Sequence, residues 1–556
     1  MQQKFLEKTL GQQIADMAAK YPDDNMIDYT DRDYSRTWKE FNDECETIAR
    51  GFMALGLKKG SHISIWGTNV PAWLLTFFGS AKMGGILVTV NTSYKVFELD
   101  YQLKQSDSEA IVLIDGYKGT SYIDIINELC PELESCEPGK LKSRRLPLLK
   151  SVIYAGEGEC PAGMVDWKDL YTLAEQTPVE EFEAVRDSCD CHEVVNIQYT
   201  SGTTGFPKGV MLTHYNILNN GQTIGDGMKF THEDRLCITV PFFHCFGMVL
   251  ALMSCISHGT PFVPIDMFNA KKVMDALATK HCTAVHGVPT MFIAMLEHPD
   301  FDKYDFSHMR TGIMAGSPCP IKTMYDVSEK MNMRDIVIVF GQTEAAPGCT
   351  MTTTEDSLET RCATVGKAFP GVECKIVDPN TGETLPAGEI GEFCARGYNI
   401  MKGYYKMPEA TAQAIDKDGW LHFGDLAVCD ENGYYKVTGR LKDMIIRGGE
   451  NIYPKELEEC LYHNDRVKDV QVIGVPSKKY GEEVCACVIL KEGEDMTEDE
   501  IKAYYKENVA FFKIPKYVWI MDEFPMTASG KIQKFVLRDM AVEKYSLQSD
   551  DSIETA

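Results

Sequence analysis

Short apolar runs that alternate with amphipathic segments predict a parallel sheet in the first part of this chain. Between about residues 60 and 340, apolar runs recur, and each is followed by glycine or proline and then by apolar residues at helical spacing. This alternation is typical of strands joined by crossover helices. The clearest expected strands are residues 63–66, 111–114, 283–286, 313–315 and 336–340.

The hydrophobic pattern changes after Gly366, where short strand-like runs separated by tight turns replace the earlier alternation. Asn432 and Gly433 lie between two apolar runs, which is the spacing of a β-hairpin. We therefore expect a small β-rich subdomain over about residues 366–442.

A separate α+β unit is expected beyond residue 443. Its expected elements are strands at 470–475, 484–490 and 517–521, a helix at 498–507 and a helix that begins at Pro454. The short polar stretch 439–443 lies between two apolar segments, so it is expected to act as a hinge. The predicted fold is a large N-terminal α/β domain with doubly wound sheets, residues 1–442, and a mobile α+β C-terminal domain, residues 443–556.

Size and charge limit the possible functions. The chain has 556 residues, more than one hydrophobic core usually supports, so two or more domains are expected. Apolar residues make up 44% and charged residues 25%, which is typical of globular proteins. The net charge of −26 argues against binding to nucleic acid or to an anionic membrane. Anionic ligands must then be held by local cationic or metal sites.

The cysteines and the apolar segments favour a cytoplasmic protein. Nineteen cysteines are scattered without a repeated spacing, which favours reduced thiols. Cys189/Cys191 and Cys485/Cys487 have no second pair at zinc-site spacing, and the latter two are expected on one face of a buried strand. The N-terminal residues lack an apolar segment of signal-peptide length. The most apolar window, residues 70–90, is interrupted by lysine and glycine, so a buried helix and strand are expected instead of a membrane span.

The stretch from Tyr199 to Gly209 is typical of a loop that wraps polyphosphate. Its glycines let the backbone turn sharply and approach a ligand, and its hydroxyls and one ammonium supply donors to phosphate oxygens. An expected strand precedes it, which places it at a ligand-binding edge of the sheet. A Walker A loop requires Gly-Lys-Ser/Thr, whereas here Pro207 precedes Lys208. A flexible linker is the alternative interpretation.

Residues 340–344 place an aromatic ring, a glycine, a hydroxyl and a carboxylate after an expected strand. The ring could cover adenine while Glu344 holds Mg²⁺, although aromatic residues at strand ends are often core residues. Asp425 follows a glycine ahead of the hairpin, where it could accept hydrogen bonds from ribose hydroxyls or only cap a turn. Arg440 could contact the ribose too, or make a surface ion pair.

Two further positions carry a cation or a titratable ring. Lys531 follows Gly530 in the expected C-terminal domain, far along the chain from the first loop. Such a cation could be presented to a phosphate and then withdrawn, although a surface lysine after a glycine turn is common. His244 lies in an apolar run, where a lone histidine is more often a core residue than a catalyst.

Together these segments closely resemble the adenylate-forming superfamily of acyl-CoA synthetases, luciferases and peptide-synthetase adenylation domains, over nearly the whole chain. The resemblance is carried by the loop ending in Pro207-Lys208-Gly209, by Gly341-x-Thr343-Glu344, by Gly424-Asp425, by Gly439-Arg440-x-Lys442-Asp443 and by Gly530-Lys531. Residues 440–459 and 512–517 are most similar to medium-chain fatty acyl-CoA ligases.

The resemblance implies ATP, Mg²⁺ and coenzyme A as ligands, and it assigns roles to particular residues. The implied ATP- and AMP-binding residues are Thr200, Ser201, Gly202, Thr203, Thr204, Gly205, Lys208, Gly316, Ser317, Pro318, Phe340, Gly341, Gln342, Thr343, Asp425 and Arg440. The implied catalytic residues are Lys531, Glu344 and His244, and the implied magnesium ligands are Glu344 and Thr204. The implied hinge is Asp443, and the implied coenzyme A contacts are Arg447, Gly448 and Gly449.

The implied reaction is an ATP-dependent ligation of a carboxylic acid to coenzyme A through an acyl-adenylate, and the resemblance favours short- to medium-chain fatty acids. Apolar segments 242–248, 285–289 and 313–316 are expected to form the acyl pocket. Aryl or other specialised acids, or a stand-alone adenylation enzyme that loads a carrier protein, are the alternatives. A kinase or P-loop ATPase and a non-catalytic binding protein are the other function classes considered, and a homodimer is possible.

Two positions depart from the usual pattern of the family. Phe423 stands where Thr or Ser commonly precedes Gly-Asp, so a hydroxyl near the nucleotide is lost. Phe340 replaces the commoner Tyr, which keeps stacking but loses a phenolic hydrogen bond. Neither departure removes a charged participant, so activity is expected to persist.

Overall fold

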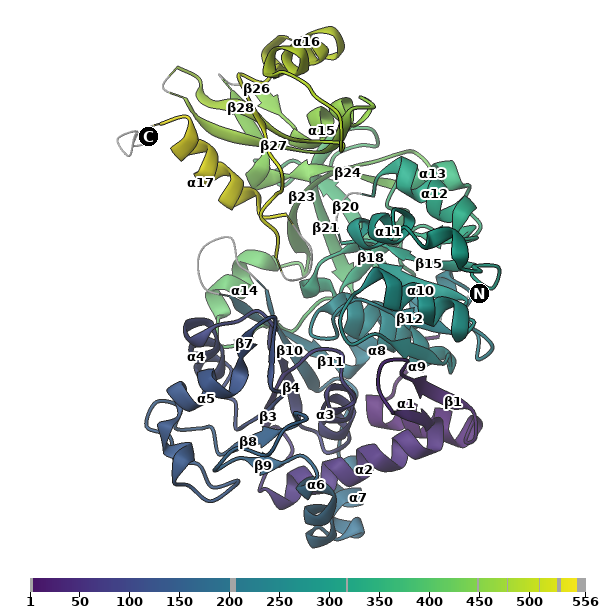
Figure 1. Cartoon of the computed structure of the whole chain (residues 1–556), viewed down its shortest axis with the longest axis vertical. Helices are drawn as coiled ribbons and strands as arrows, with labels where there is room; N and C mark the ends of the chain where they lie inside the picture. The colour runs from purple at the N-terminus through teal and green to yellow at the C-terminus, as the bar shows by residue number, and fades with distance from the viewer. Residues whose placement is uncertain are drawn as a thin grey trace. The chain divides into compact units, whose positions relative to one another are not determined.

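The computed structural model describes residues 4–547 except 201–206, 317–318, 448–449, 478, 510 and 528–531. Contacts divide the chain into two compact units (Figure 1). The first unit comprises Met1–Cys374 and Ala395–Leu421, and the second comprises Lys375–Cys394 and His422–Ala556. No helix in the described part of the chain is long and apolar enough to cross a membrane.

An eight-stranded sheet forms one half of the first unit. In pairing order its strands are β22 (Gly403–Tyr404), β11 (Lys208–Thr213), β10 (Val194–Thr200), β4 (Ile86–Thr89), β3 (His62–Trp66), β5 (Ala110–Leu113), β8 (Ser151–Tyr154) and β9 (Val165–Asp166). The strands from β10 to β9 pair in parallel, whereas β11 pairs antiparallel with both β10 and β22. The expected phosphate loop therefore joins the two strands of a hairpin, β10 and β11.

A seven-stranded sheet forms the other half of the first unit. In pairing order its strands are β16 (Asp335–Val337), β15 (Thr311–Met314), β14 (Ala284–Gly287), β12 (Leu236–Ile238), β13 (Phe262–Pro264), β1 (Asn25–Asp28) and β2 (Ser35–Thr37). All neighbours pair in parallel except β1 with β2. Two smaller sheets hold β17 (Val339–Gly341), β18 (Gly348–Met351) and β19 (Lys367–Ala368), and β6 (Gly116–Tyr117) with β7 (Thr120–Ser121).

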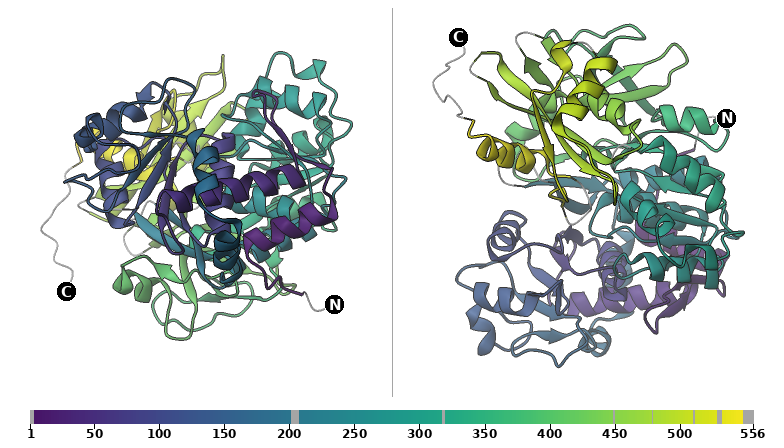
Figure 2. Two further views of the ribbon diagram at one scale, coloured as in Figure 1. Left: turned by 90° about the horizontal axis from the view of Figure 1, so that it is seen from below. Right: turned by 45° about the horizontal axis from the view of Figure 1, so that its top comes forward.

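Helices connect and cover these sheets. The α-helices of the first unit are α1 (Leu10–Lys20), α2 (Trp38–Ala54), α3 (Pro71–Lys82), α4 (Val96–Gln105), α5 (Tyr122–Leu129), α6 (Asp169–Leu173), α7 (Val179–Asp187), α8 (His214–Gly227), α9 (Ser254–His258), α10 (Ala270–Thr279), α11 (Pro289–Leu296), α12 (Ile321–Lys330), α13 (Leu358–Ala363) and α14 (Pro408–Ala414). A π-helix, η3 (Phe246–Met253), precedes α9. The N-terminal helices α1 and α2 contact each other and lie side by side in the left view of Figure 2.

Local sequence explains where several helices begin. Thr9, Thr37 and Thr213 each accept a hydrogen bond from the third helical residue, whose side chain bonds back to the threonine amide. Helix α3 has no such cap, but it begins with Pro71 and is apolar on nearly every side, so burial stabilises it. The apolar window at 70–90 is thus α3 followed by strand β4, as expected.

The expected strands at 63–66, 111–114, 283–286 and 313–315 correspond to β3, β5, β14 and β15. Each is buried along its whole length, as strands covered on both faces must be. The expectation of one strand at 336–340 was wrong. The run divides at Ile338 into β16, the edge of the seven-stranded sheet, and β17, which pairs antiparallel with β18 in a different sheet.

The second unit contains most of a four-stranded sheet and the whole of a five-stranded sheet. The four-stranded sheet, in pairing order, consists of β20 (Val372–Val377), β21 (Ile390–Gly397), β23 (Leu421–Cys429) and β24 (Tyr435–Arg440). The five-stranded sheet consists of β26 (Glu450–Ile452), β25 (Ile445–Arg447), β28 (Gly481–Leu490) and β27 (Val467–Ser477), with β29 (Tyr517–Ile520) also paired to β28. Its helices are α15 (Pro454–Tyr462), α16 (Glu498–Asn508) and α17 (Lys534–Lys544).

Two apolar clusters lie on opposite faces of the five-stranded sheet. Val470, Val472 and Val484 pack with Leu457 and Leu461 of α15 on one face. On the other face, Cys485 and Cys487 pack with α17. They alternate along β28 with residues of the first face such as Val484, so both cysteines line one face of a buried strand, as expected. The hairpin at Asn432-Gly433 is also confirmed, with Cys429 paired to Tyr435.

The second unit includes most of the four-stranded sheet as well as the C-terminal residues. Lys455 of α15 donates to the Val437 carbonyl at 2.7 Å, which ties the helix to strand β24. The division predicted between residues 442 and 443 concerns movement of one domain relative to the other, so it stays a prediction.

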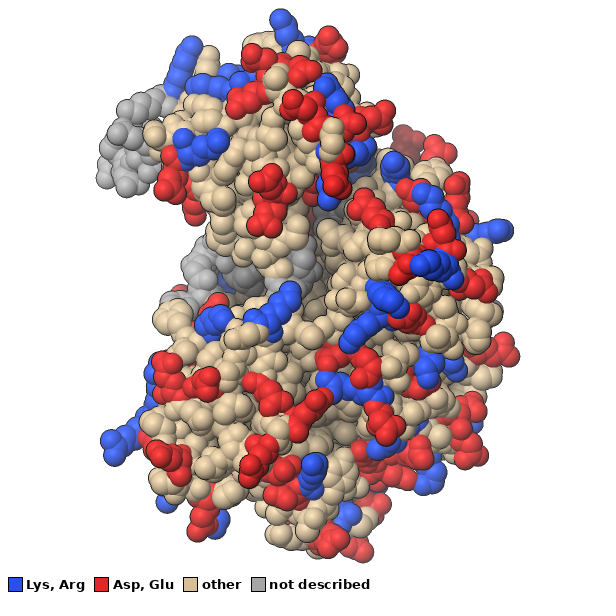
Figure 3. Space-filling model, viewed as in Figure 1, with Lys and Arg blue, Asp and Glu red and all other residues tan. Residues whose placement is uncertain are grey.

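Acidic and basic side chains are intermixed over the face in Figure 3, and the chain carries 82 acidic against 56 basic residues.

Candidate functional site

Four parallel strands of the seven-stranded sheet end at one edge and lead into most of the predicted site segments of the first unit. Strand β12 leads to His244, β14 to Pro289, β15 to Gly316, and β16 through β17 to Glu344. The carboxyl edge of a parallel sheet is the usual place for a ligand in an α/β fold. The topology thus gathers residues that are up to 100 positions apart in sequence.

The expected phosphate loop is closed at its base by strand pairing. Thr200 pairs with Lys208 in the β10–β11 register, and the phenol of Tyr101 donates to the Pro207 carbonyl at 3.0 Å. These contacts fix the two ends from which the loop leaves the sheet. The remaining predicted loop residues, Ser201, Gly202, Thr203, Thr204 and Gly205, lie outside the described residues.

Tyr404 joins two of the predicted site residues. Its hydroxyl donates to Glu344 Oε1 at 2.8 Å, and the Lys208 ammonium lies 5.0 Å from the centre of its ring, within cation–π range. Burial, followed by the negative charge of Glu344, raises the pKa of Tyr404 well above its usual value, so the phenol keeps its proton and remains a donor. Sequence reasoning missed this residue, because an aromatic side chain after glycine gives no signal of a polar contact 60 positions away.

Backbone contacts hold the same three residues in place. The Met401 amide donates to the Glu344 carbonyl at 2.9 Å, and the Tyr405 amide donates to the Gly209 carbonyl at 2.8 Å. Residues 401–405, which include β22, therefore bridge the phosphate-loop hairpin and the segment with Glu344. Tyr404 and Lys208 lie on paired strands, β22 and β11, and Glu344 lies in a 3₁₀ turn, η5 (Thr343–Ala345).

Gly341 is required where the segment of residues 340–344 turns away from β17. A Cβ atom at this position would lie 1.8 Å from the Pro347 carbonyl oxygen, a distance that no side chain tolerates. Phe340 and Gln342 are half-buried on either side of it. The close approach explains the glycine that the sequence places before Thr343 and Glu344.

The His244 segment contacts the Glu344 segment through Cys245, which follows His244, and Thr343, which precedes Glu344. Cys245 Sγ lies 3.5 Å from the Thr343 hydroxyl. Burial raises the pKa of the Cys245 thiol to about 12, so it is a thiol at neutral pH. The Phe246 amide donates to His244 Nδ1 at 3.1 Å, and this bond orients the imidazole at the start of the π-helix η3. A π-helix is often found at a functional site.

The three segments predicted to form the acyl pocket are brought together. The ring of Phe246 lies 6.2 Å from that of His286. Gly316 has a φ of +88°, and a Cβ there would lie 3.2 Å from Val288 and 4.0 Å from Phe246. Burial lowers the pKa of His286 to about 4, so this ring is neutral. Ser317 and Pro318, which follow the glycine, lie outside the described residues.

In the second unit, Asp425 and Arg440 face each other as a directly opposed pair on β23 and β24. Arg440 Nε lies 3.0 Å from Asp425 Oδ1, and the carboxylate is almost completely buried. Burial, and then the positive charge of Arg440, lower the pKa of the nearby Lys442. The two residues predicted to contact the ribose are thus adjacent and charge-paired.

Phe423 occupies a core position on the same strand. Its ring packs edge-on against Phe393 at 4.8 Å, and Phe393 in turn contacts Tyr435 at 5.3 Å. The phenylalanine found in place of the usual hydroxyl residue therefore fills an aromatic cluster of the four-stranded sheet. This packing gives a structural reason for the departure seen in the sequence.

The other predicted residues of the second unit are only partly described. Asp443 ends a 3₁₀ turn, η6 (Leu441–Asp443), and Arg447 forms an ion pair at 2.6 Å with the buried carboxylate of Glu483. Gly448, Gly449 and Lys531 lie outside the described residues. Of the residues that flank Lys531, Met526 pairs with Ile532, and the Gln533 amide donates to the Pro525 carbonyl at 2.8 Å.

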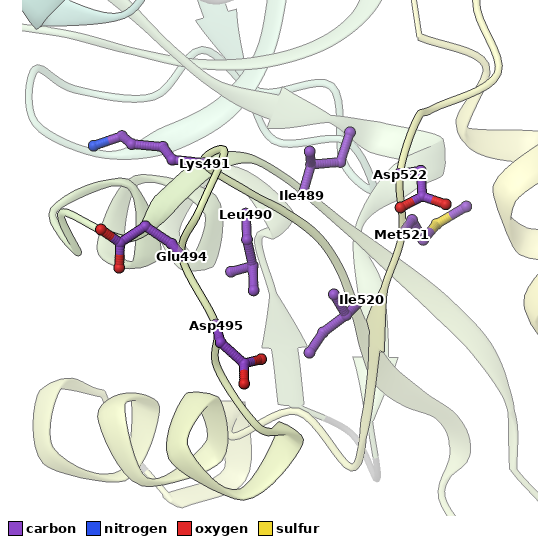
Figure 4. Close-up of a pocket in the computed structure, with 8 residues that line it drawn as sticks. All are labelled: Ile489, Leu490, Lys491, Glu494, Asp495, Ile520, Met521 and Asp522. Carbon is purple, nitrogen blue, oxygen red and sulfur yellow. The ribbon is translucent and has the colours of Figure 1, made fainter.

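A surface hollow of about 360 Å³ in the second unit contains none of the predicted site residues (Figure 4). Leu490 and Ile520 lie near its centre, with Glu494 and Asp495 on one side and Asp522 on the other. Its charged lining residues are one lysine, Lys491, and the three carboxylates, an excess of negative charge that disfavours a polyphosphate. The strand-edge residues of the first unit remain the candidate functional site.

The chain belongs to the family of AMP-binding enzymes. The family's main model, described as AMP-binding enzyme, matches residues 14–405, and the model of the AMP-binding enzyme C-terminal domain matches residues 456–531. This confirms the resemblance to adenylate-forming enzymes. It also confirms the predicted fold of a large α/β N-terminal domain followed by a C-terminal domain.

Similar proteins narrow the class further. YngI of Bacillus subtilis (strain 168), whose name places it among the acyl-CoA synthetases, is 51% identical over 546 residues, which are 98% of this chain and 99% of YngI. The mitochondrial medium-chain acyl-CoA ligase ACSF2 of Bos taurus is 39% identical over 97% of this chain and 88% of its own. The ATP-bound crystal structure of MatB from Rhodopseudomonas palustris has a TM-score of 0.83 at 28% identity, covering 97% of this chain and 100% of MatB.

Proposed function

We propose that this chain is an ATP-dependent acid:CoA ligase that converts a carboxylic acid first into an acyl-adenylate and then into an acyl-CoA thioester. The contact of Tyr404 with both Glu344 and Lys208, at the base of the loop that begins after Thr200, carries the proposal. One side chain thus contacts both a carboxylate and a cation, and a magnesium–polyphosphate ligand requires both groups. Relatives named as acyl-CoA synthetase and acyl-CoA ligase support the same reaction.

In the first half-reaction, the substrate carboxylate attacks the α-phosphate of ATP, and pyrophosphate leaves. Lys208 and the hydroxyls of Thr200, Ser201, Thr203 and Thr204 bind the phosphates. Thr200 and Lys208 pair across the hairpin, and donors fixed in this way need no reorganisation when charge develops. Phe340 covers the adenine, and Asp425 with Arg440 binds the ribose. Lys531 donates to the α-phosphate and to the attacking carboxylate as negative charge accumulates.

The residues also fit Mg²⁺. Glu344 supplies a hard carboxylate oxygen, and its protein partner, the Tyr404 phenol, is neutral and leaves the negative charge in place. Thr204 is the second ligand from the protein. When bound, Mg²⁺ neutralises the charge of the phosphate oxygens and so favours departure of pyrophosphate.

In the second half-reaction, the thiol of coenzyme A attacks the acyl-adenylate, the thioester forms and AMP leaves. Movement about Asp443 withdraws Lys531 and presents Gly448 and Gly449, whose backbone can line a narrow channel for the pantetheine arm. Arg447 binds coenzyme A, and for this its ion pair with Glu483 must be exchanged for a phosphate. His244 lies where this channel meets the acyl pocket.

The substrate is a short- to medium-chain fatty acid. The ACSF2 relative is named for medium-chain substrates, and the acyl-pocket segments meet at Phe246, His286 and Val288, which are largely apolar. We place the protein in the cytoplasm, since all nineteen cysteines are free thiols. A homodimer is a further possibility that light scattering of the purified protein can test.

Product analysis tests the proposed function. With ATP, Mg²⁺, octanoate and coenzyme A, the purified chain should release AMP and pyrophosphate and form octanoyl-CoA. A screen of acids from acetate to palmitate, with benzoate and cinnamate, then identifies the preferred substrate. Release of ADP would contradict the proposal, and acyl transfer to a carrier protein in preference to coenzyme A would favour the adenylation alternative.

A further inference from the structure

Three side chains of the four-stranded sheet form a cluster that the proposed reaction does not use. Glu392 and Cys394 lie two residues apart on β21 and so share one face, and His422 lies on the neighbouring strand β23. Glu392 Oε2 is 2.9 Å from His422 Nδ1, and Cys394 Sγ is 3.5 Å from the same nitrogen. One ligand atom from each residue lies within 4.8 Å of the others.

All three groups can act as electron-pair donors to a cation. Without a metal, Nδ1–H of His422 donates to the Glu392 carboxylate and lies beside the Cys394 sulfur, which is a weak acceptor. With a cation at the centre, the thiolate, the imidazole and the carboxylate become its ligands. The Cys394 proton goes to solvent, and the imidazole proton moves to Nε2.

The distances agree with a tetrahedral zinc site. With Zn–S of about 2.3 Å and Zn–N and Zn–O of about 2.0 to 2.1 Å, tetrahedral ligands are separated by about 3.5 Å for S to N and about 3.3 Å for N to O. The observed sulfur-to-nitrogen distance of 3.5 Å already matches, and the nitrogen-to-oxygen distance of 2.9 Å must widen slightly. A thiolate ligand disfavours Mg²⁺ and Ca²⁺ and favours Zn²⁺.

The burial of the three side chains favours a metal site with one coordination position open to solvent. Cys394 is completely buried and the Glu392 side chain is 11% exposed, whereas the His422 side chain is 32% exposed. Solvent can therefore reach the cluster from the His422 side and supply water as a fourth ligand. The other Glu392 oxygen, Oε1, accepts from the Gly424 amide at 3.0 Å and so fixes the carboxylate before any metal binds.

We infer that Glu392, Cys394 and His422 bind one Zn²⁺ ion, independently of the magnesium site of the proposed reaction. The site lies on the strand that carries Asp425, and Gly424 connects the two directly. Zinc would restrain this part of β23. The inference does not rest on the proposed function, since it concerns only metal binding by the full chain.

Metal binding by the apo chain tests this inference without any measurement of turnover. Zn²⁺ is titrated against a chromogenic chelator, and Co²⁺ is added separately because a cysteine ligand gives a thiolate-to-cobalt charge-transfer band. We expect one Zn²⁺ per chain and this band. The His422→Gln variant should bind at least about 100-fold more weakly, because Gln keeps a donor for Glu392 but is a poor zinc ligand.

Two cysteine variants show which of the two groups of possible ligands binds the ion. Glu7, Cys191 and His192 form a second group of possible ligands in the first unit, but the Glu7 and His192 side chains are 66% and 56% exposed. Cys394→Ala should abolish the cobalt band, whereas Cys191→Ala should leave it unchanged. Unfolding temperatures measured without metal confirm that each variant is folded. Absence of stoichiometric binding, equal binding by His422→Gln, or loss of the band only in Cys191→Ala would overturn the inference.

Discussion

Replacing Tyr404 with phenylalanine tests whether the tyrosine positions Glu344 for the reaction. The change removes the hydrogen bond of 2.8 Å from the phenol to Glu344 Oε1 and keeps the ring against Lys208. Because Tyr404 is largely buried and phenylalanine has the same ring, packing should be preserved. The expected result is an enzyme that folds normally but forms the adenylate slowly.

The expected loss of adenylate-forming activity follows from the hydrogen bond that Tyr404 donates to the carboxylate of Glu344. A hydrogen bond to an ionised group is worth about 1.5 to 3 kcal/mol, which corresponds to about 10- to 100-fold in rate when the whole bond serves the transition state. Tyr404→Leu should lose more, since it also removes the cation–π contact with Lys208, worth about 0.5 to 2 kcal/mol. The order of activity should be wild type, Phe variant, Leu variant.

Pyrophosphate release at saturating Mg²⁺ measures the effect, and Tyr405→Phe provides the control. Tyr405 donates to a different carboxylate, Asp107, at 2.9 Å, so its loss removes a similar bond outside the site. If Tyr404 acts through Glu344, adding Tyr404→Phe to Glu344→Gln should cost little further activity. Full activity of Tyr404→Phe, or full additivity in the double variant, would refute the positioning role.

Three other changes have definite expected outcomes. Lys531→Ala should slow adenylate formation by at least about 100-fold while preformed acyl-adenylate still reacts with coenzyme A, and equal loss of both steps would contradict the role given to this lysine. Gly341→Ala should destabilise the chain by at least about 1 to 3 kcal/mol in urea unfolding, whereas Gly439→Ala, which meets no atom within 4 Å, should not. Burial lowers the pKa of His214 and His286 to about 4 in the folded chain, whereas the ordinary value is 6.5. As the pH falls below about 6.5, these histidines therefore take up protons in the unfolded chain before they do so in the folded chain. The free energy of unfolding should then fall between about pH 6.5 and pH 4, by up to about 3 kcal/mol for each histidine. His214→Gln, which keeps an acceptor for the Leu10 amide, should flatten this pH dependence of urea unfolding, and an unchanged slope would be evidence against it.

The apolar runs predicted strands well where burial alone decides the structure. Strands β3, β5, β14 and β15 are buried along their whole length, so their sequences are mostly apolar and can be recognised without knowing their partner strands. The run at 336–340 is equally apolar, yet it divides at Ile338 between two sheets. Hydrophobicity cannot show such a division, because both halves are buried and only tertiary pairing separates them.

The candidate site was predictable where its chemistry is local and not where it depends on contacts across the fold. The composition of residues 199–209, with glycines, hydroxyls and Lys208, is enough to predict phosphate binding, and this stays a prediction. Tyr404 and Glu392 gave no such signal, because their partners are 60 and 30 positions away and are brought near only by strand pairing. Their polar roles follow from which residues face one another in a sheet.

The partners of the two predicted nucleotide-binding carboxylates support the different roles given to them. Glu344 accepts from a neutral phenol, which orients it without placing a positive charge in direct contact, and this suits a divalent cation. Asp425 is paired at 3.0 Å with the Arg440 guanidinium, which offsets its charge and makes a second cation less favourable there. A carboxylate compensated in this way still accepts hydrogen bonds from neutral hydroxyls, as a ribose-binding residue must. The electrostatic difference thus favours the proposed metal binding at Glu344 and the proposed sugar binding at Asp425.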